Sequence, residues 1–334
     1  MKLSLGHKIV IMGSVPMLAF FVSAFYGIRI NYLRAKEATH TLTRIASVRV
    51  TSLFINELQK EQSLSTLFQN NLATKEDLKA QQIQTDSQFV QLKEVYTQID
   101  LNHKTFDHVI EASNRFFRIS RPLILENKLS IEEIISQCNY IMALALHTDL
   151  EIANANDIQK LSSMIRSVNT LEIAKESVGK TKAFLVAYAT ENKSIDDDQL
   201  DSLIRSKNGT IINIESPSIT VSEGSQTRLN RFESHLYWQR IDISYRSIVK
   251  RAATGQYGIN VAELMAAALS ATEELSSIIS TEIDRINQYV FEIKSSATQT
   301  VWIICGVMAI FSTALLGFII NMVRSARKAV PHGH

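Results

Sequence analysis

The sequence predicts an all-α protein in which two transmembrane helices flank elongated antiparallel helical bundles. Two observations lead to this prediction. Residues 9–28 and 301–323 contain no Asp, Glu, Lys or Arg, and each run is long enough to cross a hydrocarbon layer of about 30 Å at about 1.5 Å per helical residue. Between them, residues 31–298 contain only two prolines and five glycines. Such sparse punctuation is typical of long helices.

Charged residues beside the second apolar segment indicate the orientation of the chain. Arg324, Arg327 and Lys328 follow this segment with no acid among them, which is typical of a cytoplasmic flank. A cleaved signal peptide is the alternative for the first segment, but Phe25 and Tyr26 stand where a cleavage site needs small residues. We therefore expect a two-pass protein of a bacterial inner membrane with its central domain in the periplasm. The predicted regions are a cytoplasmic N-terminus (1–8), a first transmembrane helix (9–28), an extracytoplasmic helical domain (29–300), a second transmembrane helix (301–323) and a short cytoplasmic tail (324–334).

The breaks in the central domain predict eight helices joined by short connections. Ser130 stands three residues before Glu133, the spacing of a capping box at a helix start. Short connections are typical of antiparallel bundles, and the first and last helices are too long for one layer, so we expect two stacked four-helix bundles. Extended structure is expected only at 210–214 and 218–221. The expected helices span residues 30–72, 75–101, 105–119, 130–148, 157–191, 197–206, 225–253 and 260–323.

Composition and motifs exclude several classes of function. The formal net charge is +2 and there are two cysteines, which give no reason to expect nucleic-acid binding or a disulfide framework. His103, His108 and His147 lack the spacing of a metal site. No catalytic triad, Gly-rich phosphate loop or paired-carboxylate arrangement stands out. We therefore expect no enzyme, no cofactor and no metal.

Charged residues interrupt two apolar helix faces. Glu57 and Glu61 project into the core stripe of the first outer helix, and a buried carboxylate must be met by a cation or by several donors. On the long helix expected from residue 157, Glu172 and Lys175 interrupt the apolar stripe beside Gly179, so this helix is the candidate partner. Two interpretations stay open: a structural ion-pair layer or solvated seam, and a small polar pocket bordered by these charges.

Three stretches of the chain resemble motifs of one family. Residues 58–65 (Leu-Gln-Lys-Glu-Gln-Ser-Leu-Ser) are similar to the Leu-Gln-Lys-Glu-Arg-Gly-Leu-Ser signature of the nitrate- and nitrite-sensing (NIT) domain. Thr85-Asp86 resembles its Gln-Arg-x-x-Thr-Asp element, and residues 174–183 resemble its Lys-Glu-x-x-Gly-x-Glu-Arg-Ala element. The resemblance covers most of residues 45–255. It implies an all-helical double bundle of the kind placed between two membrane spans in chemoreceptors and sensor kinases.

The sequence departs from these motifs at their arginines, which are Gln62, Gln82 and Lys182 here. Arginine holds a planar anion such as nitrate through paired donors, whereas lysine offers a point charge. The departures leave two alternatives: the domain binds a different anion, or it has lost ligand binding. The candidate ligand-binding residues are Arg49, Glu61, Lys175 and Lys182.

The function expected from these observations is that of a membrane-anchored sensor. A dimeric domain would detect a small ligand, such as a nitrate-like anion, outside the cytoplasm and transmit a conformational signal through both spans. Only 11 residues follow residue 323, so the output is expected in a partner protein or in the rest of a larger receptor. The alternative is a non-catalytic accessory or scaffold subunit whose bundle binds another protein.

Overall fold

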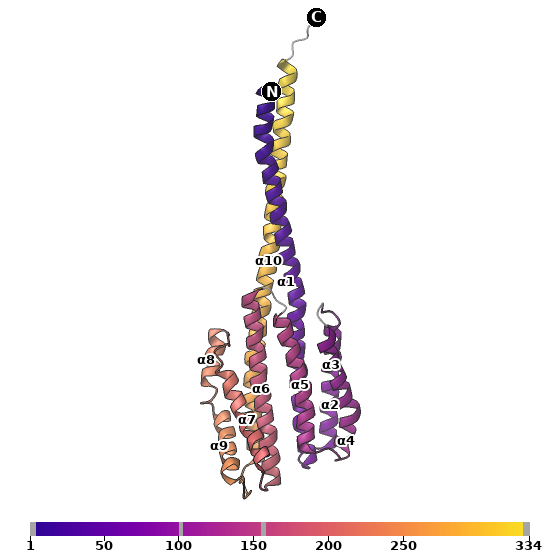
Figure 1. The fold of residues 1–334 in the computed structure, drawn as a ribbon, viewed down its shortest axis with the longest axis vertical. Helices are drawn as coiled ribbons and strands as arrows, with labels where there is room; N and C mark the ends of the chain where they lie inside the picture. Colours follow the sequence, from indigo (N-terminus) through magenta and orange to yellow (C-terminus); the bar gives the residue numbers. More distant parts are fainter. Residues whose placement is uncertain (1–4, 100–102, 155–157, 330–334) are drawn as a thin grey trace. The chain divides into compact units, whose positions relative to one another are not determined.

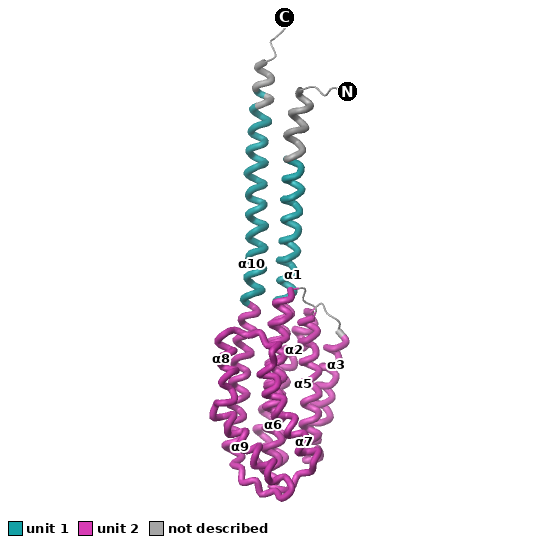
Figure 2. Tube along the Cα trace, turned by 60° about the vertical axis from the view of Figure 1, so that its left-hand side comes forward, with its two compact units in different colours: residues 1–42, 288–334 teal, residues 43–287 magenta. Residues whose placement is uncertain are grey.

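The computed structural model describes the backbone of residues 5–99, 103–154 and 158–329, and this part consists of helices and short connections (Figure 1). Side chains are described from residue 17 to residue 321, apart from residues 100–103 and 155–157, and at residue 324. The chain divides into a smaller unit, residues 1–42 with 288–334, and a larger unit, residues 43–287 (Figure 2). The predicted cytoplasmic ends, 1–8 and 324–334, fall almost entirely outside the residues with described side chains.

The smaller unit contains the N-terminal part of α1 (Leu5–Gln69) and the C-terminal part of α10 (Val261–Ala329). The rings of Phe20 and Phe311 lie 4.7 Å apart between centroids. A Cβ atom at Gly27 would lie 3.1 Å from the side chain of Ile304, so this glycine permits a close approach of the two helices. Within the described residues, one helical stretch, Val261–Asn321, is long and apolar enough to span a membrane. The predicted first span begins among residues whose side chains are not described, and it stays a prediction.

The first four-helix group of the larger unit is formed by α1, α2, α5 and one discontinuous helix. The discontinuous member runs from α3 through a π-helical turn, η1, into α4. All four members contribute to one apolar core, in which Tyr96 stacks on Phe106 with 4.3 Å between ring centroids. The predicted capping box is confirmed, because Ser130 and Glu133 exchange both expected hydrogen bonds at the start of α5. The bounds are α2 (Lys75–Tyr96), α3 (His103–Arg115), η1 (Phe116–Ser120), α4 (Arg121–Leu125) and α5 (Ile131–Asn154).

The second four-helix group is formed by α6, α7, α10 and the broken pair α8 and α9. The single helix expected at 225–253 is interrupted by turns, and His235 has an extended backbone before α9 begins. Residues 210–214, expected to be extended, instead complete α7, because Thr210 and Ile214 are buried on its inner face and packing overrides their β propensity. The bounds are α6 (Gln159–Glu191), α7 (Asp197–Ile214), α8 (Glu223–Arg231) and α9 (Leu236–Arg251).

The two groups lie side by side, and the expected end-to-end stack is wrong (Figure 1). Helices α5 and α6 pack together along their length, and Ser52 of α1 donates a hydrogen bond to Glu172 of α6. The prediction assigned the whole length of the first and last helices to the bundles. Only residues 43–69 of α1 and 261–287 of α10 belong to the larger unit, and these lengths fit a single layer.

Two chain reversals are locked together at one end of the larger unit. Asn192 ends α6 in the left-handed conformation, with φ 54°, and its side-chain oxygen accepts a hydrogen bond of 2.8 Å from the backbone N–H of Tyr257. The Tyr257 hydroxyl donates to the Lys193 carbonyl at 2.5 Å. Gly255 has a left-handed backbone, with φ +69°. A Cβ atom at this position would lie 2.8 Å from the backbone oxygen of Asn192. The α6–α7 and α9–α10 connections therefore stabilise each other.

We expect Gly255→Ala to lower the free energy of unfolding by about 2 kcal/mol or more, because a left-handed backbone and a clash with backbone atoms must both be accommodated. Thermal unfolding of the purified chain measures this. Gly224→Ala is the control, since a Cβ there meets nothing within 4 Å, and it should change stability by less than about 1 kcal/mol. Equal effects of the two substitutions would contradict the proposed locking of the two reversals.

Candidate functional site

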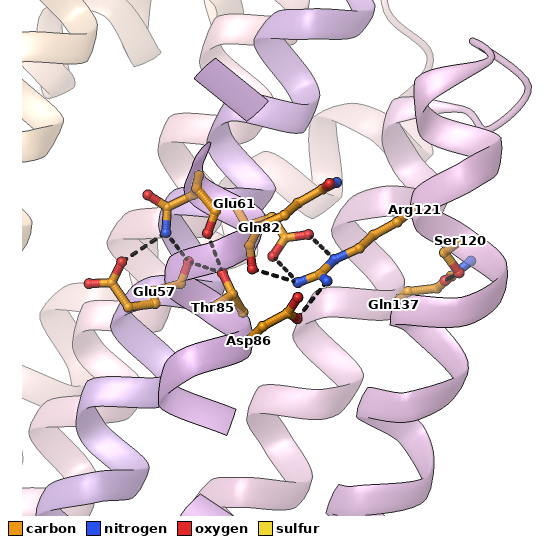
Figure 3. Close-up of polar contacts among 9 residues, drawn as sticks. Glu57, Glu61, Gln82, Thr85, Asp86, Ser120, Arg121 and Gln137 are labelled. Atoms are coloured by element: carbon orange, nitrogen blue, oxygen red, sulfur yellow. Dashed lines mark hydrogen bonds and ion pairs between the residues drawn. The ribbon is translucent and has the colours of Figure 1, made fainter. Parts of the chain in front are cut away.

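Glu61 is completely buried and is bound by Arg121 of α4 (Figure 3). The guanidinium donates from Nε to one carboxylate oxygen at 2.7 Å and from Nη2 to the other at 2.8 Å. It also donates from Nη1 to Asp86 of α2 at 2.6 Å and from Nη2 to the Gln82 carbonyl at 3.4 Å. The ring of Phe117 lies 3.9 Å from the guanidinium carbon. Glu61 is therefore fully satisfied, and we assign it a structural role.

The partner of Glu61 is different from the one expected. The sequence pointed to the long helix carrying Lys175, whereas the structure supplies Arg121, which stands before Pro122 at the end of a π-helical turn. A π-helical turn holds more residues than an α-helical turn and changes which residues of the following helix face the core. Burial lowers the pKa of Arg121, but the hydrogen bonds and charges of Glu61 and Asp86 raise it overall. Arg121 therefore stays charged.

Glu57 lies at the edge of the same network (Figure 3). Its carboxylate accepts hydrogen bonds from Lys60 at 2.7 Å and from the side-chain amide of Gln81 at 2.8 Å. The hydroxyl of Thr85 donates to the Glu57 carbonyl at 3.3 Å. Polar contacts therefore join α1 to α2 beside the buried pair.

Arg49 and Lys175, both predicted site residues, line one small cavity that is partly open to solvent and is formed by residues of α1, α6 and α10. Its volume is about 110 Å³. A water molecule occupies roughly 30 Å³ in the liquid, so the cavity has room for about four waters or for an anion of similar size. Most of the other lining groups are polar, and the hydroxyl of Ser276 has no hydrogen-bond partner among the described residues. The lining residues are Arg49, Ser52, Leu53, Asn56, Lys175, Ser276, Ser280 and Ile283.

Each cation of this cavity has a carboxylate partner. Lys175 Nζ lies 2.7 Å from Glu172, and both side chains are only 1% exposed. Glu172 also accepts a hydrogen bond from Ser52, 120 residues earlier in the chain. Arg49 pairs with Asp284 of α10, where the two side chains are 39% and 65% exposed. The cavity therefore has one buried ion pair in its wall and one solvent-exposed ion pair beside it.

Lys182 does not line the cavity, although it follows Lys175 by seven residues and so lies on the same face of α6. It is half-buried and shows no ion pair or hydrogen bond within the described part of the chain. Burial lowers the pKa of Lys182 to about 8. Burial on α6 therefore disfavours the charged form of Lys182.

Gln62 and Lys182, two of the three positions where the motifs have an arginine, lie on α1 and α6. These two helices are in contact where the side chain of Gln59 lies 3.6 Å from the position that a Cβ atom would take at Gly179. The side chain of Gln62 donates to α5, where it reaches Asn139 at 3.1 Å. A Cβ atom at position 179 would therefore make an ordinary van der Waals contact with Gln59, and the contact of the two helices does not require a glycine there.

Three comparisons place this geometry among known proteins. A family model described as nitrate and nitrite sensing (NIT) matches residues 53–289, and this confirms the resemblance seen in the three motifs. A solved structure entitled "Structure of the NasR transcription antiterminator" is similar, with a TM-score of 0.69 and 11% identity over 96% of this chain and 91% of that one. At this identity the similarity shows the fold alone. The search of curated proteins finds no match.

We expect Arg121→Met to lower the free energy of unfolding by about 3–5 kcal/mol, because it leaves the Glu61 carboxylate buried without a cation. Urea unfolding of the purified chain measures this. Arg118→Met is the matched control, since Arg118 is exposed on the same turn, and it should change stability by less than about 0.5 kcal/mol. The double variant Glu61→Leu/Arg121→Met should recover more than half of the loss, and failure to do so would contradict the ion-pair explanation.

We expect Lys182→Met to raise the stability at pH 7 by about 1–3 kcal/mol, because the charged lysine is disfavoured where it lies. The pKa of Lys182 falls from its ordinary 10.5 to about 8 on folding. Between these values the unfolded chain binds more protons, so wild-type stability rises with pH in this window. Urea unfolding at pH 7 and pH 9.5 should show that rise in the wild type and in the exposed control Lys79→Met, and a smaller rise in Lys182→Met.

Proposed function

Because this chain belongs to the nitrate- and nitrite-sensing (NIT) family, we propose that it is a sensor whose Arg49–Lys175 cavity binds a small oxyanion such as nitrate or nitrite. The single observation that supports this site best is that Arg49, Lys175 and three serines are among the residues that line one pocket of about 110 Å³. A planar anion of four heavy atoms accepts charge-assisted hydrogen bonds from guanidinium and ammonium groups. We infer that these side chains would supply the donors for such a ligand.

The carboxylates that pair with the two cations of the cavity would not prevent an anion from binding there. The Arg49–Asp284 pair is exposed, and exposed ion pairs contribute only about 0–1 kcal/mol, so the guanidinium can turn toward a ligand at little cost. The buried Lys175 offers its positive charge from the wall, and the Ser276 hydroxyl offers a donor that is otherwise unused. Binding would therefore replace a weak surface pair with charge-assisted hydrogen bonds to the anion.

The position of the cavity supports a route for the signal. Its lining residues come from α1 and α10, the two helices that also form the smaller unit, and from α6. An anion that prefers one spacing of α1 against α10 would shift the population of conformers toward that spacing. We propose that this shift passes along both helices to a cytoplasmic output, in a chain that is membrane-anchored and dimeric.

A second candidate function is that of an accessory subunit that binds another protein and no anion. It is favoured by the carboxylate partners of both cavity cations and by Gln62 in place of the motif arginine. The titration below separates the two candidates.

Calorimetric titration of the full chain in detergent with nitrate and with nitrite should show saturable binding. Arg49→Met should weaken it by about 10- to 100-fold, because one charge-assisted hydrogen bond contributes about 1.5–3 kcal/mol. Arg205→Met is the control, since Arg205 forms an exposed pair with Asp201 of the same helix and does not line the cavity. The affinity of the Arg205→Met variant for nitrate and nitrite should stay within twofold of that of the wild type. If millimolar nitrate or nitrite gives no saturable heat with the folded wild type, the sensor proposal is wrong and the accessory function stands.

A further inference from the structure

A second depression lies between η1 and α5, in the first four-helix group. This η1–α5 groove has a volume of about 380 Å³, is partly open to solvent and is formed by residues of α3, η1, α4 and α5. Small-molecule sites commonly have volumes of about 300–1,000 Å³, and at about 30 Å³ per water molecule the groove has room for roughly 12 waters. None of its described lining residues also lines the Arg49–Lys175 cavity. The groove is therefore a separate space.

The lining of the η1–α5 groove is mostly apolar. Phe116 and Ile141 are buried and form its floor. Ile119 and Tyr140 are 55% and 61% exposed and stand at its rim. Single apolar side chains on a protein surface are normal, but these two large ones border the same depression. A ligand with an apolar body would remove this apolar area from water, which favours binding.

The π-helical turn explains why Ile119 faces outward. The backbone N–H of Arg121 donates to the carbonyl of Phe116, five residues earlier, so the turn holds one residue more than an α-helical turn. Both ends of the turn are held in the core, because Phe116 is buried and Arg121 binds Glu61. Arg118 and Ile119, between them, are exposed. Turns of this kind occur frequently at functional sites.

The lining of the groove offers one charged group, Arg115. The hydroxyl of Ser120 donates to the side-chain oxygen of Gln137 (Figure 3), so these two polar lining residues bind each other. Arg115, at the end of α3, is exposed and forms neither an ion pair nor a hydrogen bond among the residues that the structure describes. No carboxylate occurs among the described lining residues. The groove therefore places one unpaired cation beside an apolar surface.

We propose that the η1–α5 groove is a second ligand site, which binds a small aromatic carboxylic acid. The ring of such a ligand would lie against Ile119 and Tyr140, since aromatic rings pair favourably with one another. Its carboxylate would meet the guanidinium of Arg115, which offers paired donors. Arg115 would repel a cationic ligand, and a neutral ligand would leave this cation unused. The inference does not rest on the anion cavity, because the two sites share no described residue.

Calorimetric titration of the full chain in detergent with naphthoate and with naphthamide, its neutral analogue of the same shape, tests the proposal. Naphthoate should bind saturably with a Kd of about 0.1–1 mM. Arg115→Gln should weaken naphthoate binding by about 3- to 10-fold, because an exposed charge pair is lost, and should leave naphthamide binding within twofold. Arg118→Gln is the matched control, since Arg118 is exposed on the next turn and does not line the groove. It should bind both compounds as the wild type does.

A blocking variant shows whether the ligand occupies the groove itself. Ser136 is exposed on α5 and lines the groove, so Ser136→Trp should fill the space and abolish saturable binding of both compounds. Its thermal unfolding should match that of the wild type, which shows that the variant is folded.

Three results would overturn the proposal. Naphthoate binding that survives Ser136→Trp would lie elsewhere on the chain. Equal affinity of the wild type for naphthoate and naphthamide, or an unchanged naphthoate affinity in Arg115→Gln, would exclude an acid as the ligand. Absence of saturable heat with the folded wild type would exclude the site. Nitrate affinity should be the same in all these variants, so the groove and the sensor proposal can fail independently.

Discussion

The burial of charge on α6, where the two helix groups meet, is the constraint on which the rest of the structure depends. Glu172 and Lys175 are each 1% exposed, on a helix that also packs against α5, α7 and α9. Removing two charges from water costs several kcal/mol per ion, and their attraction offsets this only when the geometry is good and further hydrogen bonds are made. Ser52 supplies one such bond from α1. The Glu172–Lys175 pair lies within α6, so a change of register of α1 against α6 would keep the pair but would remove the hydrogen bond that Ser52 donates to Glu172.

The two buried ion pairs of the larger unit, Glu61–Arg121 and Glu172–Lys175, differ in their surroundings. Around Glu61 and Arg121 every charged group has good partners, and Asp86 completes the network. The side-chain amide nitrogen of Gln82, beside this pair, is buried without a hydrogen-bond partner among the described residues. Lys175, by contrast, lines a cavity together with Ser276, whose hydroxyl has no partner among those residues. For this reason we propose anion binding at the Arg49–Lys175 cavity and not beside Glu61.

Much of the fold was predictable because it depends on local rules. The helical class followed from the scarcity of proline and glycine, and the start of α5 from the capping box of Ser130 and Glu133. The break between α8 and α9 was missed, because no glycine or proline marks it and the turn before His235 is held by hydrogen bonds to the carbonyls of Arg231 and Phe232. The partner of Glu61 was missed because Arg121 is 60 residues away, beyond a π-helical turn that periodicity at 100° per residue does not reveal.

The sequence by itself determined the helical class, the family and the charged residues that interrupt the apolar faces, since each of these depends on residue type and spacing along one chain. Only the tertiary structure decided that the two groups lie side by side, that Glu61 is satisfied by Arg121, and that Arg49 and Lys175 face the same cavity while Lys182 does not. The physical reason is that partners of buried charges are chosen by packing between helices distant in sequence. The apolar segments with which the chain begins and ends need no such partners, and composition alone marks them.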